Sequence, residues 1–408
     1  MVDLVDKGPT SDPITTEVIR GWMESVTDEM QATIIKTAHS QLICEARDAT
    51  CALFDRDGRT AAQASAMPIH LGVLAELGRR FAAQYPAGVA QPGDLYITND
   101  PYAGGTHMPD IAISAPVFYD DELVGYVSTM AHHKDIGGLL PASVSVKARD
   151  IHAEGLRLPI MRIASAGEMN DDLMTVIVAC SRSPQSFRGD LGAQIAACNT
   201  GVRRFQELFG RWPVETVYDS IGALMDYSER MTRHEIEAIP DGDYYFEDWL
   251  DDDAVTADSG PIKIAVTMTV RGDELVFDFD GSGEQVESSI NNVLTSTEAV
   301  VFYIVRTLTG DSVPNNDGCY RPITVRAPLG SIVNCAYPAA VASRGLSLLR
   351  IEDVVNGAMG KALPGRMTAA HSGQYNMVGV AGIDPASGER MIGHLGGPVV
   401  GGHGARPT

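Results

Sequence analysis

Near the start of the chain, apolar residues recur at every fourth position: Val18, Trp22, Val26 and Met30. This spacing places them along one face of an α-helix, and that face must be buried against another element. The Thr15-Thr16 pair just before them can cap the first turn. The pattern therefore predicts a long helix over residues 16–40.

The next part of the chain alternates short extended runs with further helical stretches. In CALFDRDGRTAAQ, Asp57-Gly58 stands between two extended runs, a strong signal for a hairpin turn. The other elements expected before residue 240 are helices over 67–85 and 187–209 and strands at 95–100 and 122–133. This part of the chain is therefore expected to mix strands and helices.

After Pro240 apolar and polar residues alternate along the chain. The runs IKIAVTMTV and ELVFDFD, joined through Arg271-Gly272-Asp273, place apolar residues at every second position, as antiparallel strands with one buried face do. Helices are expected again over 297–308 and 347–362. The sequence therefore predicts a mixed α+β fold, with an α/β domain over residues 1–240 and a β-rich domain with helices over 241–408.

Composition and charge narrow the functional classes. With 408 residues and 44% apolar composition, the chain can bury a large core. Its net charge of −22 would repel a phosphate backbone, so nucleic-acid binding is not expected. No apolar stretch is long enough to cross a bilayer and the N-terminus has no apolar signal core, so a cytoplasmic location is expected. The six scattered cysteines form no CxxC pair and are expected to be mostly buried thiols.

Histidines and aspartates concentrate in NDPYAGGTHMPDI and AHHKDIGG. His107 and Asp110 lie three residues apart in a turn-prone stretch and can converge on one cation. A third ligand is available at the end of the strand predicted over 122–133, where only one of His132 and His133 can face that cation. Two imidazoles and a carboxylate leave positions open for water or substrate, as a catalytic divalent metal needs. From the residues alone, a hydrogen-bonded polar core or a solvated loop remains the alternative.

Two further residues are candidates for catalysis beside this metal site. His133 could be an acid–base group next to the cation, or a structural histidine. Asp135, like Asp100, is close enough in sequence to orient a ligating histidine from outside the coordination shell. His70, in MPIHLG, is either a residue that faces the substrate or the cap of the next helix.

Five blocks of the sequence together resemble the B subunit of the hydantoinase/oxoprolinase family, which also includes the large subunit of acetone and acetophenone carboxylases. The blocks are NDPYAGGTHMPDI, AHHKDIGG, EARDATCALFDRDGRTAAQ, MPIHLG and DFDGSG. The resemblance implies a divalent metal site, of manganese, zinc or iron, at His107, Asp110 and His132. It also implies Asp48, in the EARDAT block, as a fourth ligand.

The resemblance also implies that ATP is used on a different subunit or domain from the one that carries the metal site. The chain has no GxxxxGK[ST] loop, since GAMGKAL at 357–363 lacks the hydroxyl residue after lysine, so ATP is not expected to bind here. In the resembling enzymes a separate A-type subunit, or a fused A domain, phosphorylates an amide or enol oxygen with ATP, and the activated species reacts at the metal of the B part. A hetero-oligomeric partnership with such a subunit is therefore expected.

The expected activity is hydrolysis of a cyclic amide, as in a hydantoinase, oxoprolinase or lactamase. The alternatives are a subunit of an ATP-dependent ketone carboxylase and a non-catalytic assembly partner. Family members usually continue beyond a glycine-rich GGxGAR segment, whereas this sequence stops at GGHGARPT. The resemblance thus implies that the second domain is incomplete at its C-terminal end.

Overall fold

A seven-stranded sheet forms the centre of the first half of the protein. The computed structural model describes residues 12–65, 67–370, 373, 376–385, 388 and 390–397. The strand order is β2-β1-β5-β4-β3-β6-β7, and every neighbouring pair is antiparallel. The strands are β1 (Ala49–Phe54), β2 (Thr60–Gln63), β3 (Leu95–Thr98), β4 (Asp110–Tyr119), β5 (Glu122–His132), β6 (Met161–Ser165) and β7 (Glu168–Met169).

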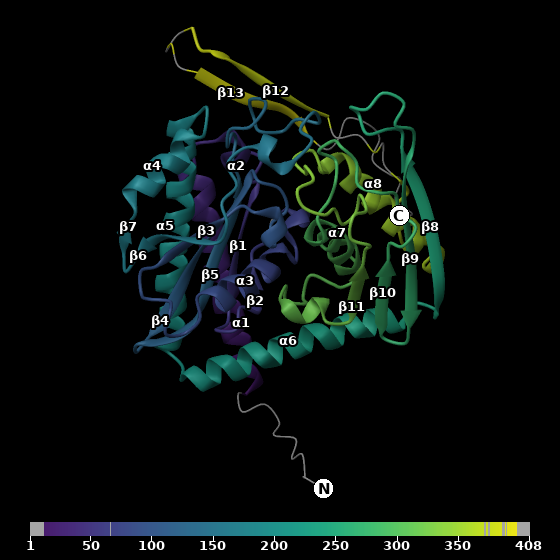
Figure 1. Cartoon of the computed structure of the whole chain (residues 1–408). Coiled ribbons are helices and arrows are strands. Elements are labelled where there is room, and N and C mark those ends of the chain that lie inside the picture. Colours follow the sequence, from purple (N-terminus) through teal and green to yellow (C-terminus); the bar gives the residue numbers. More distant parts are fainter. Residues whose placement is uncertain are drawn as a thin grey trace.

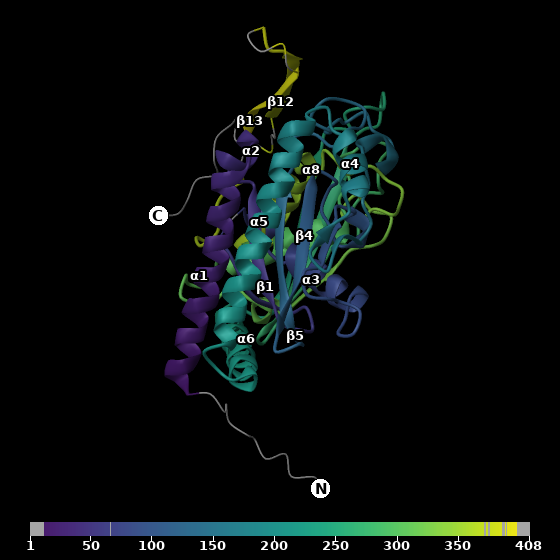
Figure 2. The same ribbon diagram turned by 90° about the vertical axis from the view of Figure 1, so that its left-hand side faces the viewer.

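Helices cover both faces of this sheet because its strands bury side chains on both sides. In β1, Cys51 and Leu53 pack in the core formed with α1 (Pro13–Thr37) and α5 (Pro184–Phe209). Ala52 and Phe54 point the other way and pack against α3 (Val73–Gln84). Figure 2 shows α1 and α5 side by side over one face of the sheet. The shorter helices of this half are α2 (Gln41–Cys44), α4 (Asp171–Ala179), η1 (Pro68–His70), η2 (Pro101–Ala103) and η3 (Ile151–Glu154).

The second half is built on a four-stranded sheet of order β11-β10-β9-β8. Its strands β8 (Gly242–Leu250), β9 (Ile262–Arg271) and β10 (Glu274–Asp278) are antiparallel, and β11 (Ile323–Arg326) is parallel to β10. The alternating residues Ile264, Val266, Met268 and Val270 of β9 are fully buried in a core shared with α7 (Leu294–Arg306) and α8 (Gly345–Ala362). The period-two pattern of the sequence therefore reflects this one-sided burial.

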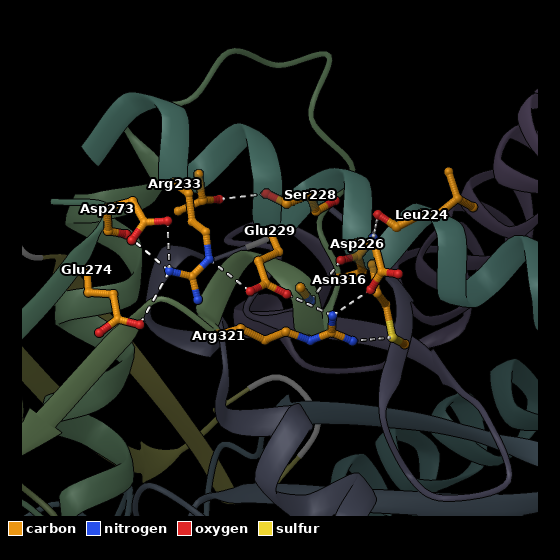
Figure 3. A network of polar contacts seen from close by, with 12 residues as sticks. Leu224, Asp226, Ser228, Glu229, Arg233, Asp273, Glu274, Asn316 and Arg321 are labelled. Atoms are coloured by element: carbon orange, nitrogen blue, oxygen red, sulfur yellow. Dashed lines mark hydrogen bonds and ion pairs between the residues drawn. The ribbon is translucent and has the colours of Figure 1, made fainter. Parts of the chain in front are cut away.

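The helix α6 (Val214–Glu237) connects the two halves and runs beneath both of them (Figure 1). Its Glu229 accepts hydrogen bonds from Arg233 on the same helix and from Arg321, which follows η4 (Asp317–Tyr320). Arg233 also lies 3.2 Å from Asp273, in the turn between β9 and β10 (Figure 3). This network of charges fixes the helix against the second sheet.

A hairpin of β12 (Asn376–Ile383) and β13 (Arg390–Gly397) projects from the body of the molecule (Figure 1). The glycine-rich end at 398–408 lies outside the described residues. Among the described residues, no helix combines the length and the apolar character that a membrane span requires.

The α+β fold class predicted from the sequence is confirmed, and so is the hairpin turn at Asp57-Gly58. Four cysteines are buried and Cys44 and Cys180 are partly exposed, all six with free thiols. The first helix begins at Pro13, earlier than expected, because the Asp12 side chain rather than a threonine caps it. The domain boundary near residue 240 stays a prediction.

One expectation for the helices needs correction, and one long helix is additional to those expected. The helix expected over 67–85 is divided into η1 and α3 at Gly72, whose backbone has φ of 77°. A side chain there would also collide with the Phe302 ring, because its Cβ atom would lie 2.5 Å from that ring, so the chain turns at this glycine. The additional long helix is α6, in which Val217, Ile221 and Leu224 recur at helical spacing.

Candidate metal centre and cavity

Two imidazoles and a carboxylate meet at one end of the central hairpin of the first sheet. Asp110 is the first residue of β4 and His132 the last of β5, and the antiparallel register pairs them directly. His107 comes from the turn just before β4, where its carbonyl accepts a hydrogen bond from the Asp110 backbone N–H. Short-range chain geometry and strand pairing thus bring all three residues together.

Their ligand atoms converge closely. His107 Nε2 lies 3.2 Å from Asp110 Oδ1 and 3.1 Å from His132 Nδ1, and His132 Nδ1 lies 3.0 Å from the same Asp110 oxygen. Donor atoms about 2.1 Å from one metal ion, at angles between tetrahedral and octahedral, lie about 3.0–3.4 Å from one another. Among the described residues this is the one group of three or more histidine, cysteine or acidic side chains with metal-ligand spacing.

Hydrogen bonds to the outer atoms hold this cluster in place. His107 Nδ1–H donates to the carbonyl of Ala342 at 3.0 Å, which leaves the Nε2 lone pair facing the other two residues. Arg344 Nη2 lies 2.9 Å from Asp110 Oδ2, and the hydroxyl of Thr106 donates to the same oxygen. Both the orientation of the imidazole and the charge of the carboxylate are therefore supported from outside the cluster.

The electrostatics of the cluster favour an ionised aspartate beside a neutral His107. Burial alone would raise the pKa of Asp110, but His107, His132 and Arg344 hold it well below its ordinary value. Burial and the charge of Arg344 lower the pKa of His107 to about 4. Burial also disfavours the charged form of His132, yet its hydrogen bond to Asp110 raises its pKa. The carboxylate is thus a permanent anion at this end of the sheet.

A cavity of about 540 Å³ opens beside the cluster, which forms part of its wall. The rest of the wall is largely apolar and comes from η1, from the loop after β5, from α7 and from α8; it includes Ile69, Leu140, Val146, Val300 and Leu346. Asp48 and His70 also face the cavity, with Asp48 Oδ1 3.6 Å from His70 Nε2. Asp48 contributes no atom to the group of three converging ligands.

The sequence model of the Hydantoinase B/oxoprolinase family matches residues 12–408. The chain belongs to the hydantoinase B/oxoprolinase family. It is 33% identical over 378 residues to the caprolactamase subunit beta of Pseudomonas jessenii, an alignment that covers 92% of this chain and 64% of that protein. The chain thus spans slightly less than two thirds of the length of that relative.

Solved structures share the fold of this family member. The crystal structure of the ATP-dependent caprolactamase from Pseudomonas jessenii superposes with a TM-score of 0.88 at 32% identity, over 94% of this chain and 66% of that one. A nucleotide-free acetone carboxylase superposes with a TM-score of 0.86 at 17% identity, over 97% of this chain and 54% of that one. The second likeness concerns the fold alone.

In this hydantoinase B family member, His132 and His133 point to opposite sides of the sheet. His132 faces the cluster, whereas His133 packs under α5, with its Nε2 2.8 Å from Gln194 Oε1 and its ring 4.8 Å from that of Phe187. His133 is fully buried and does not line the cavity. The alternation expected from the sequence is therefore observed, and the contacts of His133 favour a structural role.

The two aspartates considered for outer support are engaged elsewhere. Asp135 accepts hydrogen bonds from the backbone N–H groups of Gly137, Ala142 and Arg182 and forms an ion pair with the Arg182 side chain. Asp100 caps η2 and lies 3.7 Å from Arg157. Within the described part of the chain, neither carboxylate is hydrogen-bonded to a histidine of the cluster. A catalytic role for Asp135 stays a prediction, and its contacts favour a role in shaping the loop after β5.

Two of the groups that support the cluster, the Ala342 carbonyl and the Arg344 side chain, are not indicated by any feature of the sequence. Ala342 and Arg344 lie more than 200 residues beyond the cluster in the chain, and no motif links them to it. A backbone carbonyl carries no signal in a sequence, because every residue has one. Arg344 follows a run of small apolar residues, and only its burial beside a carboxylate marks it as part of the site.

Proposed function

We propose that the chain is the metal-dependent subunit of an ATP-dependent enzyme that hydrolyses cyclic amides. The observation that carries this proposal is the convergence of His107, Asp110 and His132 at the wall of a large apolar cavity. Support also comes from a relative at 33% identity that is a caprolactamase subunit, since caprolactam is a cyclic amide. The remainder of the activity is inferred from these two facts.

The three residues fit a divalent cation. Their donor atoms are 3.0–3.2 Å apart, one of them is an anion, and His107 has its lone pair turned inward by the bond to Ala342. Two imidazoles and one carboxylate suit manganese, zinc or iron. When bound, such an ion supplies Lewis acidity, which polarises a substrate oxygen or activates water near neutral pH. Asp48 is proposed as a further ligand because its carboxylate faces the same cavity.

The cavity determines what kind of substrate can reach the cluster. Its wall is largely apolar over the surfaces of η1, α7 and α8, so most of the body of the substrate is shielded from water there. Arg344 also lines the cavity, and its Nη2 is held by Asp110 Oδ2, so its positive charge is partly neutralised there. These features favour a cyclic amide with an apolar ring or substituent, held with its amide group toward the cluster.

The proposal assigns ATP to a partner. An amide is a poor electrophile because of resonance, and phosphorylation of its oxygen creates a good leaving group. The sequence has no phosphate-binding GxxxxGK[ST] loop, and the caprolactamase relative is named as one subunit of its enzyme. We therefore propose a hetero-oligomer in which an A-type subunit consumes ATP and this chain provides the hydrolytic site.

The experiment combines metal analysis with reconstitution. The purified chain is expected to hold about one divalent ion, and the His107→Ala variant to lose most of it. Mixed with an A-type subunit, the chain should support ATP turnover that depends on caprolactam, hydantoin or 5-oxoproline.

Other outcomes decide between the alternatives. Turnover that requires a ketone and bicarbonate would identify a carboxylase subunit instead. A chain that binds no metal would favour an assembly partner, and full metal content in His107→Ala would refute the ligand assignment.

A further inference from the structure

A buried carboxylate outside the metal cluster accepts hydrogen bonds from a distant segment of backbone. Glu154, the last residue of η3, is 2% exposed. Its Oε1 accepts hydrogen bonds from the N–H groups of Val341 and Ala342, both at 2.6 Å. These donors are 187 and 188 residues further along the chain, so this contact joins two separate parts of the fold and is not a local turn.

The segment held by Glu154 is the one that supports the cluster. The carbonyl of Ala342 accepts the Nδ1–H of His107, on the peptide unit next to the one whose N–H Glu154 binds. Two residues later, Arg344 forms the ion pair with Asp110. A displacement of this backbone would therefore disturb two of the three residues of the cluster at once.

Glu154 is itself held firmly from the other side. The carbonyl of Ala153 accepts the backbone N–H of Leu139, in the loop that follows β5. Gly138 packs so tightly on Glu154 that a side chain there would lie 2.5 Å from its backbone carbonyl. Glu154 thus links the loop after His132 to the segment behind His107.

The side chain of Glu154 is not buried in order to form an ion pair. Among the described residues its Oε2 has no hydrogen-bond partner, and no cation pairs with it. Burial raises its pKa to about 8, against the opposing effect of the two backbone N–H groups. Its hydrogen bonds are therefore those that Oε1 accepts from the successive N–H groups of Val341 and Ala342, and these two bonds fix the position of that backbone segment.

We propose that Glu154 is a positioning residue for the metal centre, acting through the 341–344 segment to hold His107 and Arg344 in register with Asp110. This inference rests on the metal site of the proposed function. A side chain that orients ligands from outside the coordination shell typically changes metal affinity by about 10–100-fold when removed. The same range is expected for Glu154.

The test measures metal affinity of the chain alone, by competition of Zn²⁺ and Mn²⁺ against a chelating indicator. Glu154→Ala should bind about 10–100-fold more weakly than wild type. Glu154→Gln keeps a carbonyl oxygen at the position of Oε1 and should restore affinity to within about threefold of wild type.

Asp253→Ala provides the matched control. Asp253 is also 2% exposed, and its Oδ1 accepts the N–H groups of Val255 and Thr256, but it lies in the connection between β8 and β9. Its loss should lower the thermal stability and leave metal affinity unchanged. If Glu154→Ala does not fold, Glu154→Asp, which withdraws the carboxylate by one methylene, replaces it with the same expected loss.

The inference is overturned if Glu154→Ala binds metal as tightly as wild type, if Glu154→Gln is as weak as Glu154→Ala, or if Asp253→Ala weakens binding equally. A wild-type chain without metal would instead refute the proposed function on which the inference depends. The two failures are therefore distinguishable in one experiment.

Discussion

Replacing His132 and His133 in turn should separate the metal centre from the core of the sheet. His133 Nε2–H donates to Gln194 Oε1, since Gln194 uses its amide nitrogen to donate to the carbonyl of Ile111 at 2.8 Å. The His133 ring also packs edge-on against Phe187. His133→Ala thus removes a buried hydrogen bond and a ring from the interface between the sheet and α5, with no change to an atom of the metal cluster.

The expected loss of stability for His133→Ala can be worked from these contacts. Gln194 Oε1 would be left without a donor in a buried position, which costs about 1–3 kcal/mol. The space left by the ring adds about 1–2 kcal/mol, because the packing beside Phe187 relaxes only in part. The free energy of unfolding should therefore fall by about 3 kcal/mol.

The assay is urea denaturation together with metal content after gel filtration. His133→Ala should keep its metal and lose stability, with activity in the reconstituted enzyme reduced only modestly. His132→Ala should lose at least about 90% of its metal, because a ligand is removed directly.

Two results would contradict this reasoning. Loss of metal in His133→Ala with retention in His132→Ala would mean that the register of β5 is wrong. A drop in activity of about a hundredfold at unchanged stability would show that His133 transfers protons, as the sequence alone allowed.

Three further predictions follow from the surroundings of the site. Arg182 donates hydrogen bonds to the carbonyls of Gly137, Gly138 and Leu140, in the loop after β5 that forms part of the cavity wall. Arg182→Ala should therefore loosen this loop, accelerate its limited proteolysis and raise KM several-fold at unchanged metal content; equal cleavage of the variant and wild type would contradict this. Val146→Trp should fill part of the cavity and raise the KM of the reconstituted enzyme for its cyclic-amide substrate about tenfold or more while the metal stays bound, and an unchanged KM would exclude this cavity as the substrate site. The pKa of Glu154 is about 8 in the fold, against 4.5 for a free glutamate, so the folded state binds the extra proton and wild-type stability falls as pH rises from 4.5 to 8. Glu154→Gln does not titrate, so the difference in free energy of unfolding between this variant and wild type, both without metal, should change by about 3–5 kcal/mol in favour of the variant between pH 4.5 and 9. A difference that does not change with pH would refute this prediction.

The sequence by itself determined the features that depend on residues close together in the chain. The turn at Asp57-Gly58 follows from the local backbone preferences of those two residues. The opposite orientation of His132 and His133 follows from the period of two in any strand. The proximity of His107 and Asp110 was likewise predictable, because they are three residues apart with a proline between them.

Only the tertiary structure decided what surrounds those residues. The pairing of Asp110 with His132 depends on the register of two strands, and the support from Ala342, Arg344 and Glu154 depends on contacts across 187 residues or more. Such contacts form because burial brings distant segments together and buried polar groups must find partners. Nothing in the local pattern of a sequence specifies which distant segment will provide them, so the convergence of the three candidate ligands could be predicted and the residues that hold them in place could not.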